Sequence, residues 1–247
     1  MDRGFYIAGS AADLRRQLSM DQIANNLANV NTVGFKADRN SFATMLTDSM
    51  RAASSAQPPS AYLAPGMSYI DTSEGMIRQT GSPLDFAISG DGYFRVRLKD
   101  GSEGYTRAGD FMLGEGGKLV TQSGLPVLDS AGAPITLPSG EVSASRDGTI
   151  AVNGTRIATL GIVQISDSSK MRKLGGTLFT APADQVRPVQ PGKVVVRHGA
   201  LEQSNVNAVL AMARMVDTTR SFQNMMKIVE IYNQQATQLS ERVGRVG

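Results

Sequence analysis

Residues 204–243, SNVNAVLAMARMVDTTRSFQNMMKIVEIYNQQATQLSERV, decide the fold of this chain. From Ala208 to Val243, side chains that recur at alternating spacings of three and four residues are apolar with one exception. This heptad pattern predicts one long helix with a continuous apolar seam, and Ser204 or Asn205 is expected to cap its start. A helix with so much apolar surface needs a second helix to cover it.

The N-terminal residues predict that second helix. Residues 2–31 carry apolar side chains at helical spacing in two sets, one ending at Leu18 and one beginning at Met20. At about 100° per residue the two sets lie roughly half a turn apart, so the helix has different apolar faces at its two ends. Such faces suit contact with more than one partner, although burial within one domain would also explain them. Gly34 is the expected terminator.

Proline and glycine divide the chain into helical ends and a β-rich middle. All ten Pro lie within residues 58–191, together with most of the Gly, so the main helix breakers are concentrated there. We therefore predict an α+β protein. Its long N- and C-terminal helices pair in a discontinuous, coiled-coil-like domain, 1–35 with 200–247. A linker over 36–66 leads to an inserted all-β domain, an antiparallel sheet or barrel over 67–199.

Two stretches carry the strand prediction. Residues 84–98 alternate apolar and polar side chains on both sides of a Gly-Asp-Gly turn. The pair Asn153-Gly154 separates the strand-like runs 149–152 and 155–165, which predicts a two-residue hairpin. We expect a segment of about 67–197 to fold on its own.

The composition argues against several functional classes. The chain has no Cys and a single His, His198, so zinc sites of the usual Cys/His type are excluded. The net charge is only +3 and is spread evenly, without the basic stripe that a nucleic-acid-binding protein needs. No motif places a nucleophile beside His198, and the Gly-rich pieces indicate turns. We expect no catalytic residue, cofactor, metal or small-molecule substrate. A hydrolase that depends on His198 stays an alternative, testable by substitution.

The sequence also gives expectations about signal peptides and membrane insertion. The N-terminal residues include Arg3, Asp13, Arg15 and Arg16 and have no apolar stretch of signal-peptide length. No run of 18 apolar residues occurs, so membrane insertion is not expected. We expect a cytosolic protein, or one exported without a cleaved signal.

An Asn-rich run ends the first predicted helix. Asn25, Asn26, Asn29 and Asn31 fall close together, although Asn lowers helix propensity by competing for backbone hydrogen bonds. Asn25 and Asn29 share one face, where buried amides would fix the register between helices. A frayed, capped helix end is the alternative.

Four blocks of sequence are similar to one known family. They are residues 23–36, 83–94, 105–111 and 199–207, and they include the runs IANNLANVNT, LDFAISGDGYF, YTRAGDF and GALEQSNVN. They resemble, in order, the signature motifs of the flagellar rod and hook proteins.

That resemblance implies a function. Such proteins are structural, and they are exported through the flagellar type III apparatus without cleavage. They assemble, with copies of themselves or with neighbouring rod subunits, into a helical tube that crosses the periplasm within the flagellar basal body. Paired terminal helices form the inner layer around the export channel, the β domain faces outward, and the rod transmits torque. Residues 35–42 and 220–227 look most like the proximal-rod member; a distal-rod or hook subunit is the alternative.

The candidate assembly residues are drawn from the apolar faces, the Asn-rich run, the Gly-Phe pair that follows it and the start and seam of the C-terminal helix. They are Leu14, Leu18, Ile23, Asn25, Asn26, Leu27, Asn29, Asn31, Gly34, Phe35, Asn205, Asn207, Met215, Phe222, Met225, Val229, Tyr232 and Leu239. A different class of function, a monomeric adhesin-like binding module, would be recognised by a mass in solution that does not change with concentration.

Overall fold

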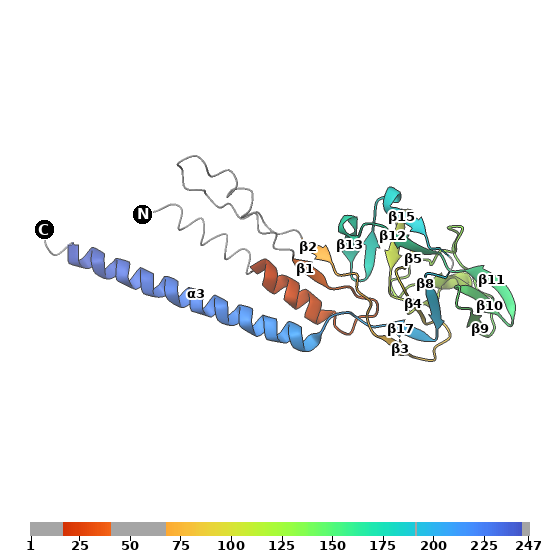
Figure 1. Ribbon diagram of the computed structural model, residues 1–247, viewed down its shortest axis with the longest axis horizontal. Helices are drawn as coiled ribbons and strands as arrows, with labels where there is room; N and C mark the ends of the chain where they lie inside the picture. Colours follow the sequence, from red (N-terminus) through yellow and green to blue (C-terminus); the bar gives the residue numbers. More distant parts are fainter. Residues whose placement is uncertain (1–16, 41–67, 191, 244–247) are drawn as a thin grey trace. The chain divides into compact units, whose positions relative to one another are not determined.

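A computed structural model describes residues 17–40, 68–190 and 192–243. These residues form two compact units (Figure 1). The helical unit contains residues 17–27 and 207–243, and the β unit contains residues 28–40 and 68–206. The helical ends and the β-rich middle predicted from the sequence are therefore both present. The exact predicted domain limits stay a prediction, although residues 28–35 and 200–206 pack in the β unit.

The helical unit consists of a helical segment over residues 17–28 and the long helix α3 (Ala208–Val243). The two lie side by side where the Thr219 hydroxyl approaches the Met20 sulfur at 3.9 Å. Along α3, the better-covered side chains include Ala211, Met215 and Met225, which belong to the predicted seam. The predicted pairing of terminal helices is thus visible over this part of the chain.

Both predicted helix ends need correction. α3 is capped by Asn207, whose side-chain oxygen accepts a hydrogen bond from the Leu210 amide at 3.0 Å, and not by Ser204 or Asn205. The N-terminal helix ends at residue 28, six residues before Gly34. Gly34 does have a positive φ of 66°, but it is not the helix cap.

The β unit is built from antiparallel strands. Its largest sheet consists, in spatial order, of β13 (Arg172–Gly175), β14 (Leu178–Thr180), β6 (Glu103–Thr106), β5 (Tyr93–Arg97), β12 (Ile162–Ile165) and β15 (Val186–Pro188). A three-stranded sheet consists of β11 (Thr155–Thr159), β10 (Thr149–Val152) and β9 (Val142–Ala144). Two-stranded pairs are β1 (Asp38–Asn40) with β2 (Ser68–Ile70), β16 (Val195–His198) with β4 (Phe86–Ser89), β17 (Ala200–Glu202) with β3 (Ile77–Gln79), and β7 (Met112–Leu113) with β8 (Leu119–Val120). The 3-10 helices are η1 (Glu115–Gly117), η2 (Ser168–Lys170) and η3 (Ala183–Gln185).

The strand predictions hold in outline and fail in two details. Asn153 and Gly154 form the predicted hairpin turn, both at positive φ. The predicted strand 155–165 is divided at Gly161, because β11 pairs with β10 whereas β12 pairs with β5 and β15. β4 is buried on both faces rather than alternately, since Ala87 is as buried as its neighbours. Among the described strands the sheets are open, so the barrel alternative is wrong.

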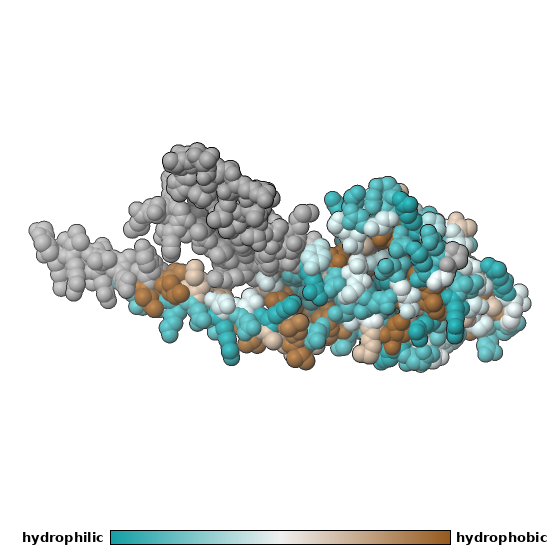
Figure 2. All heavy atoms as spheres, viewed as in Figure 1, coloured by the Kyte–Doolittle hydropathy of each residue, from teal (hydrophilic) through white to brown (hydrophobic). Residues whose placement is uncertain are grey.

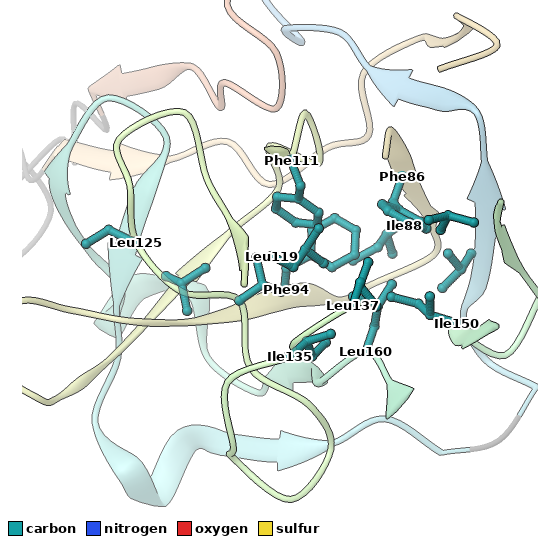
Figure 3. Packing of buried hydrophobic residues seen from close by; sticks show 14 of the residues in the cluster. Phe86, Ile88, Phe94, Phe111, Leu119, Leu125, Ile135, Leu137, Ile150 and Leu160 are labelled. Atoms are coloured by element: carbon teal, nitrogen blue, oxygen red, sulfur yellow. The ribbon is translucent and has the colours of Figure 1, made fainter. Parts of the chain in front are cut away.

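Two clusters of apolar side chains form the core of the β unit. In the larger one, the Phe94 and Phe111 rings meet edge to face, with centroids 5.2 Å apart (Figure 3). The smaller one gathers around Phe179 and Tyr93, between the sheet and Met171. Of the residues that the structure describes, none from 28–40 belongs to either cluster.

Candidate assembly site

The β unit is closed by a clamp between two segments that are far apart in the sequence. We use this name for residues 34–37 and 202–205 together with Arg107. The Gly34 amide donates to the Glu202 carbonyl at 2.8 Å, and the Asn205 amide donates to the Phe35 carbonyl at 3.3 Å. The helical segment 17–28 precedes the clamp by a few residues, and α3 follows it by a few residues. Both helical segments therefore join the β unit at the clamp.

Three buried charges lie at the centre of the clamp. Lys36 Nζ is 2.6 Å from Glu202 Oε1, and Arg107 Nη1 is 3.2 Å from Glu202 Oε2. The side chains of Lys36, Glu202 and Arg107 are 0%, 1% and 1% exposed. One carboxylate thus lies between two cations, each held by a different oxygen.

Further hydrogen bonds surround these charges, although the buried Arg107 Nε has no hydrogen-bond partner. Lys36 Nζ also donates to the Ser73 carbonyl at 2.6 Å, and the Gly75 amide donates to Glu202 Oε1 at 2.9 Å. Arg107 donates to the carbonyls of Ile88 and Gly90, at 3.1 and 2.7 Å. Buried charges are tolerated when they are paired and hydrogen-bonded in this way.

Burial governs the protonation of Lys36. Removal from water lowers the pKa of its ammonium group below the usual value, and the charge and hydrogen bond of Glu202 offset this only in part. Arg107 lowers the Lys36 pKa further, while Glu74 acts in the opposite direction. The cost of burying the cation therefore exceeds the attraction of its carboxylate partner.

Asn205 is the polar hub of the clamp. Its side-chain oxygen accepts from the Ala37 amide at 2.8 Å, and its side-chain nitrogen donates to the carbonyls of Asp71 and Ser73, at 2.9 and 3.1 Å. Burial alone would raise the pKa of Asp71, but hydrogen bonds from Ser73 and the charge of Arg39 bring that pKa below its usual value. Asn205 is consequently committed to the β unit and does not cap α3.

A third cation, Lys173, contacts residues 35–38. Its Nζ donates to the Lys36 carbonyl at 2.7 Å and pairs with Asp38 Oδ1 at 2.9 Å. The same ammonium lies 4.2 Å from the centre of the Phe35 ring, a favourable cation–π distance.

Two glycines allow the segments to approach each other. A Cβ at Gly34, which already has φ of 66°, would lie 2.2 Å from the Ala108 nitrogen. A Cβ at Gly75 would lie 1.9 Å from the Gln203 carbonyl oxygen. Neither position has space for a side chain, so close backbone packing is built into the clamp.

The residues predicted to form the assembly interface are divided between the two units. Three lie in the clamp: Gly34, Phe35 and Asn205. Those in residues 17–31 are exposed or half-buried: Leu18, Ile23, Asn25, Asn26, Leu27, Asn29 and Asn31. Those at the start of α3 and on it are also exposed or half-buried: Asn207, Met215, Phe222, Met225 and Val229. Leu14 and the side chains of Tyr232 and Leu239 lie outside the described residues. The role of this set in assembly stays a prediction.

Sequence reasoning did not identify the charged centre of the clamp. Lys36, Arg107 and Glu202 were not among the candidate residues, yet each lies inside one of the motif blocks on which the family resemblance rests. A charged residue inside such a block, with at least one apolar neighbour, was the signal available.

Helix α3 is rich in exposed apolar side chains. Val209 is 79% exposed, and Figure 2 shows apolar, brown patches along the described part of the helix. The large exposed members are Val209, Leu210, Met212, Val216, Phe222, Met226, Ile228, Val229 and Ile231. An apolar surface of this extent is typical of a helix that binds partners.

His198 has a structural role. Its Nε2 lies 2.8 Å from the Pro83 carbonyl oxygen, and its ring packs 5.5 Å from that of Phe86. Within the described ranges, no group of three or more acidic or His side chains is placed to hold a metal ion. Over the same residues, none of the helices combines the length and apolarity required to traverse a bilayer.

The structure thus has a β unit closed by a clamp, and the two helical segments adjoin the clamp in the sequence. Residues 5–36 match the flagella basal body rod protein family, and residues 87–163 match the D1 domain of the flagellar hook protein FlgE/F/G. Residues 197–241 match the C-terminal domain of the flagellar basal body rod FlgEFG proteins.

Full-length relatives agree with these matches. The chain is 39% identical over 228 residues to the flagellar basal-body rod protein FlgF of Rhizobium meliloti (strain 1021), with 91% of each chain covered. It is 32% identical over 254 residues to FlgF of Caulobacter vibrioides, with 100% of each covered. It is 36% identical over 236 residues to FlgG of Bacillus subtilis, covering 86% of this chain and 89% of the relative. The chain belongs to the flagellar basal-body rod proteins and is FlgF-like. It is thus a non-enzymatic, structural component of the flagellar basal body.

Proposed function

We propose that this chain is a subunit of the proximal part of the flagellar rod and that it polymerises helically through its terminal helices. Its partners are copies of itself or neighbouring rod subunits of the same family. The exposed apolar surface of α3 carries the proposal, because the described residues of the helical unit leave that surface uncovered. Burial of one such side chain stabilises an interface by about 1.5–3 kcal/mol.

One exposed position on α3 tests the proposal. Val216→Asp places a charge on the apolar surface without disturbing the half-buried seam, so the subunit should fold but fail to enter the rod. Ser221→Asp is the matched control, since Ser221 is exposed and lies about 140° around the helix from Val216. Purified basal bodies are examined for the subunit, and motility is scored. Normal incorporation of the Val216→Asp protein would contradict assembly through this surface.

The position along the rod is a separate question. Similarity to FlgF relatives supports the proximal part, while the FlgG relatives keep a distal position, or a hook subunit, as the alternative. A density map of intact basal bodies, with this chain traced in it, decides between them. A monomeric mass at every concentration, with no place in the rod, would favour the binding-module alternative.

We also propose that the flagellar export apparatus delivers the subunit without proteolysis, as the family resemblance implies. The intact mass of the chain recovered from basal bodies should correspond to a start at or near Met1. Loss of some twenty N-terminal residues would contradict this route.

A further inference from the structure

Residues 34–40 lie in the β unit as a bound peptide lies in a receptor. We call them the docking segment. Apart from the Phe35 amide, which donates to the nearby Thr32 carbonyl at 3.3 Å, the contacts described for them are made with residues 68–205. Lys36 contacts Glu202, Ala37 contacts Asn205 and Asp71, and β1 pairs with β2 through a three-residue antiparallel register. Phe35, Lys36 and Ala37 are buried by these contacts.

Neither of the two apolar clusters of the β unit includes the docking segment, although Phe35 and Ala37 are buried. Both core clusters are made from residues 70–196, and the packed side chains around them also come from that range. Removal of the segment therefore leaves the main source of stability of the β unit in place.

Departure of the docking segment would not leave the buried Glu202 carboxylate without partners. Glu202 Oε2 is paired with Arg107, and Glu202 Oε1 has a second donor in the Gly75 amide. If Lys36 departs, the Glu202 carboxylate keeps a buried cation and an amide hydrogen bond. Arg107 would then remain as the buried counter-charge of Glu202.

The residues that contact the docking segment favour a peptide of particular sequence. The Ser73 carbonyl and Glu202 Oε1 receive an ammonium group, and Lys173 lies over an aromatic ring. Position 34 has no space for a Cβ. The peptide that fits is thus glycine, an aromatic residue and lysine, followed by a small residue whose amide reaches Asn205.

We propose that residues 68–206 form a receptor for the docking segment, and that docking is a separate event from folding of the β core. Two states follow, docked and undocked, that share the same apolar core. One further step rests on the proposed function. In a rod subunit, docking would bring the end of segment 17–28 and the start of α3 close to the clamp before assembly.

Hydrogen exchange on the full-length monomer tests the two states. Lys36→Glu sets a carboxylate against Glu202 and should undock the segment, with Lys118→Glu at an exposed position as the matched control. The amides of Gly34, Ala37, Asp71 and Asn205, which are hydrogen-bonded in the clamp, should lose protection in Lys36→Glu alone. Amides of β5, β10 and β12 should stay protected. Loss of protection in those strands, or unchanged protection in the clamp, would overturn the proposal.

A peptide supplied in trans provides the second test. A synthetic peptide of residues 31–41 should bind the full-length Lys36→Glu protein and restore protection at Asp71 and Asn205. The same peptide with Glu at position 36 should not bind, and the wild-type protein, whose site is occupied, should bind neither. Absence of binding to the Lys36→Glu protein would overturn the receptor. Since both tests use the monomer, a failure of rod incorporation alone would count against the proposed function and not against docking.

Discussion

At the residue scale, the sharing of one carboxylate by two cations determines how the clamp responds to substitution. Glu202 is the only carboxylate within the described clamp that contacts both Lys36 and Arg107. Removing one member of a buried ion pair is harmful chiefly because it leaves the other charge uncompensated. The three residues are therefore unequal.

Glu202→Gln should be the most damaging of these substitutions, since it leaves two buried cations without a counter-charge. We expect a loss of about 3–5 kcal/mol in the free energy of unfolding, measured by denaturant titration. Lys36→Met should cost clearly less, because Glu202 keeps Arg107. Glu103→Gln, which breaks the partly exposed pair with Arg95, is the control and should cost about 1 kcal/mol or less. Equal losses for Glu202→Gln and Lys36→Met would contradict this reading of the clamp.

The lowered pKa of Lys36 predicts a pH dependence of definite sign. Between its lowered folded pKa and the unfolded value of 10.5, the unfolded state binds more protons, so stability contributed by Lys36 rises with pH. The free energy of unfolding of wild type minus that of Lys36→Met should therefore increase as the pH rises toward 10.5, over the interval in which Lys36 is protonated in the unfolded state but not in the folded state. Burial raises the pKa values of Tyr93 and Tyr105 and acts oppositely at high pH, but equally in both proteins. A constant or falling difference would be incompatible with the lowered pKa.

Single residues were the hardest part to predict from the sequence. Asn205 and Asn207 look equally suited to cap a helix, and only the position of Asp71 and Ser73 decides that Asn205 is used elsewhere. Lys36 and Glu202 are 166 residues apart, and charged side chains are by default expected at the surface. Their burial results from the tertiary contact between them, which cannot be predicted from the residues adjacent to either one.

At the scale of elements, the sequence predicted those helices and turns whose geometry depends on residues close together in the chain. The long helix α3 and the Asn153-Gly154 hairpin were both found, because side-chain period and turn geometry are properties of the segment itself, whereas the seam is covered only in part. The break at Gly161 was missed, since there the backbone packs against the Asp129 carbonyl, 2.4 Å from where a Cβ would lie. That approach depends on the fold around it.

The limits of the β unit give a prediction about fragments. The segment 67–197 expected from the sequence to fold alone lacks β17 and Glu202, which would leave Arg107 buried without its carboxylate. A fragment of residues 28–206 should melt cooperatively, whereas 67–197 should not, as followed by circular dichroism against temperature. The fragment 68–206, which retains Glu202, should melt cooperatively at a lower temperature than 28–206. A cooperative transition of 67–197 at the temperature of 28–206 would show that β17 and the clamp add nothing.

At the scale of the whole molecule, the two units differ in how their apolar surface is covered. The β unit has its own core, but α3 leaves large apolar side chains exposed. Helices of this kind gain most of their stability from packing an apolar face. Ordering of the helical unit should therefore be coupled to assembly.

Hydrogen exchange on the monomer and on assembled rods measures that coupling. Amides of residues 17–28 and of α3 should exchange rapidly in a dilute monomer and slowly in rods. Amides of β5 and β12 serve as the internal control and should be protected in both. Strong protection of α3 in a verified monomer would favour a helical unit that is complete in itself.

The hydrogen bond from the Gly34 amide to the Glu202 carbonyl has a mechanical consequence. A pull on the two helical segments enters the β unit at residues 34–37 and leaves it at residues 202–205, so the load passes through the clamp. The strands of the core lie outside that stretch of the chain. If the chain is the rod subunit proposed above, a load on its helical segments would act first on the buried Lys36–Glu202 contact.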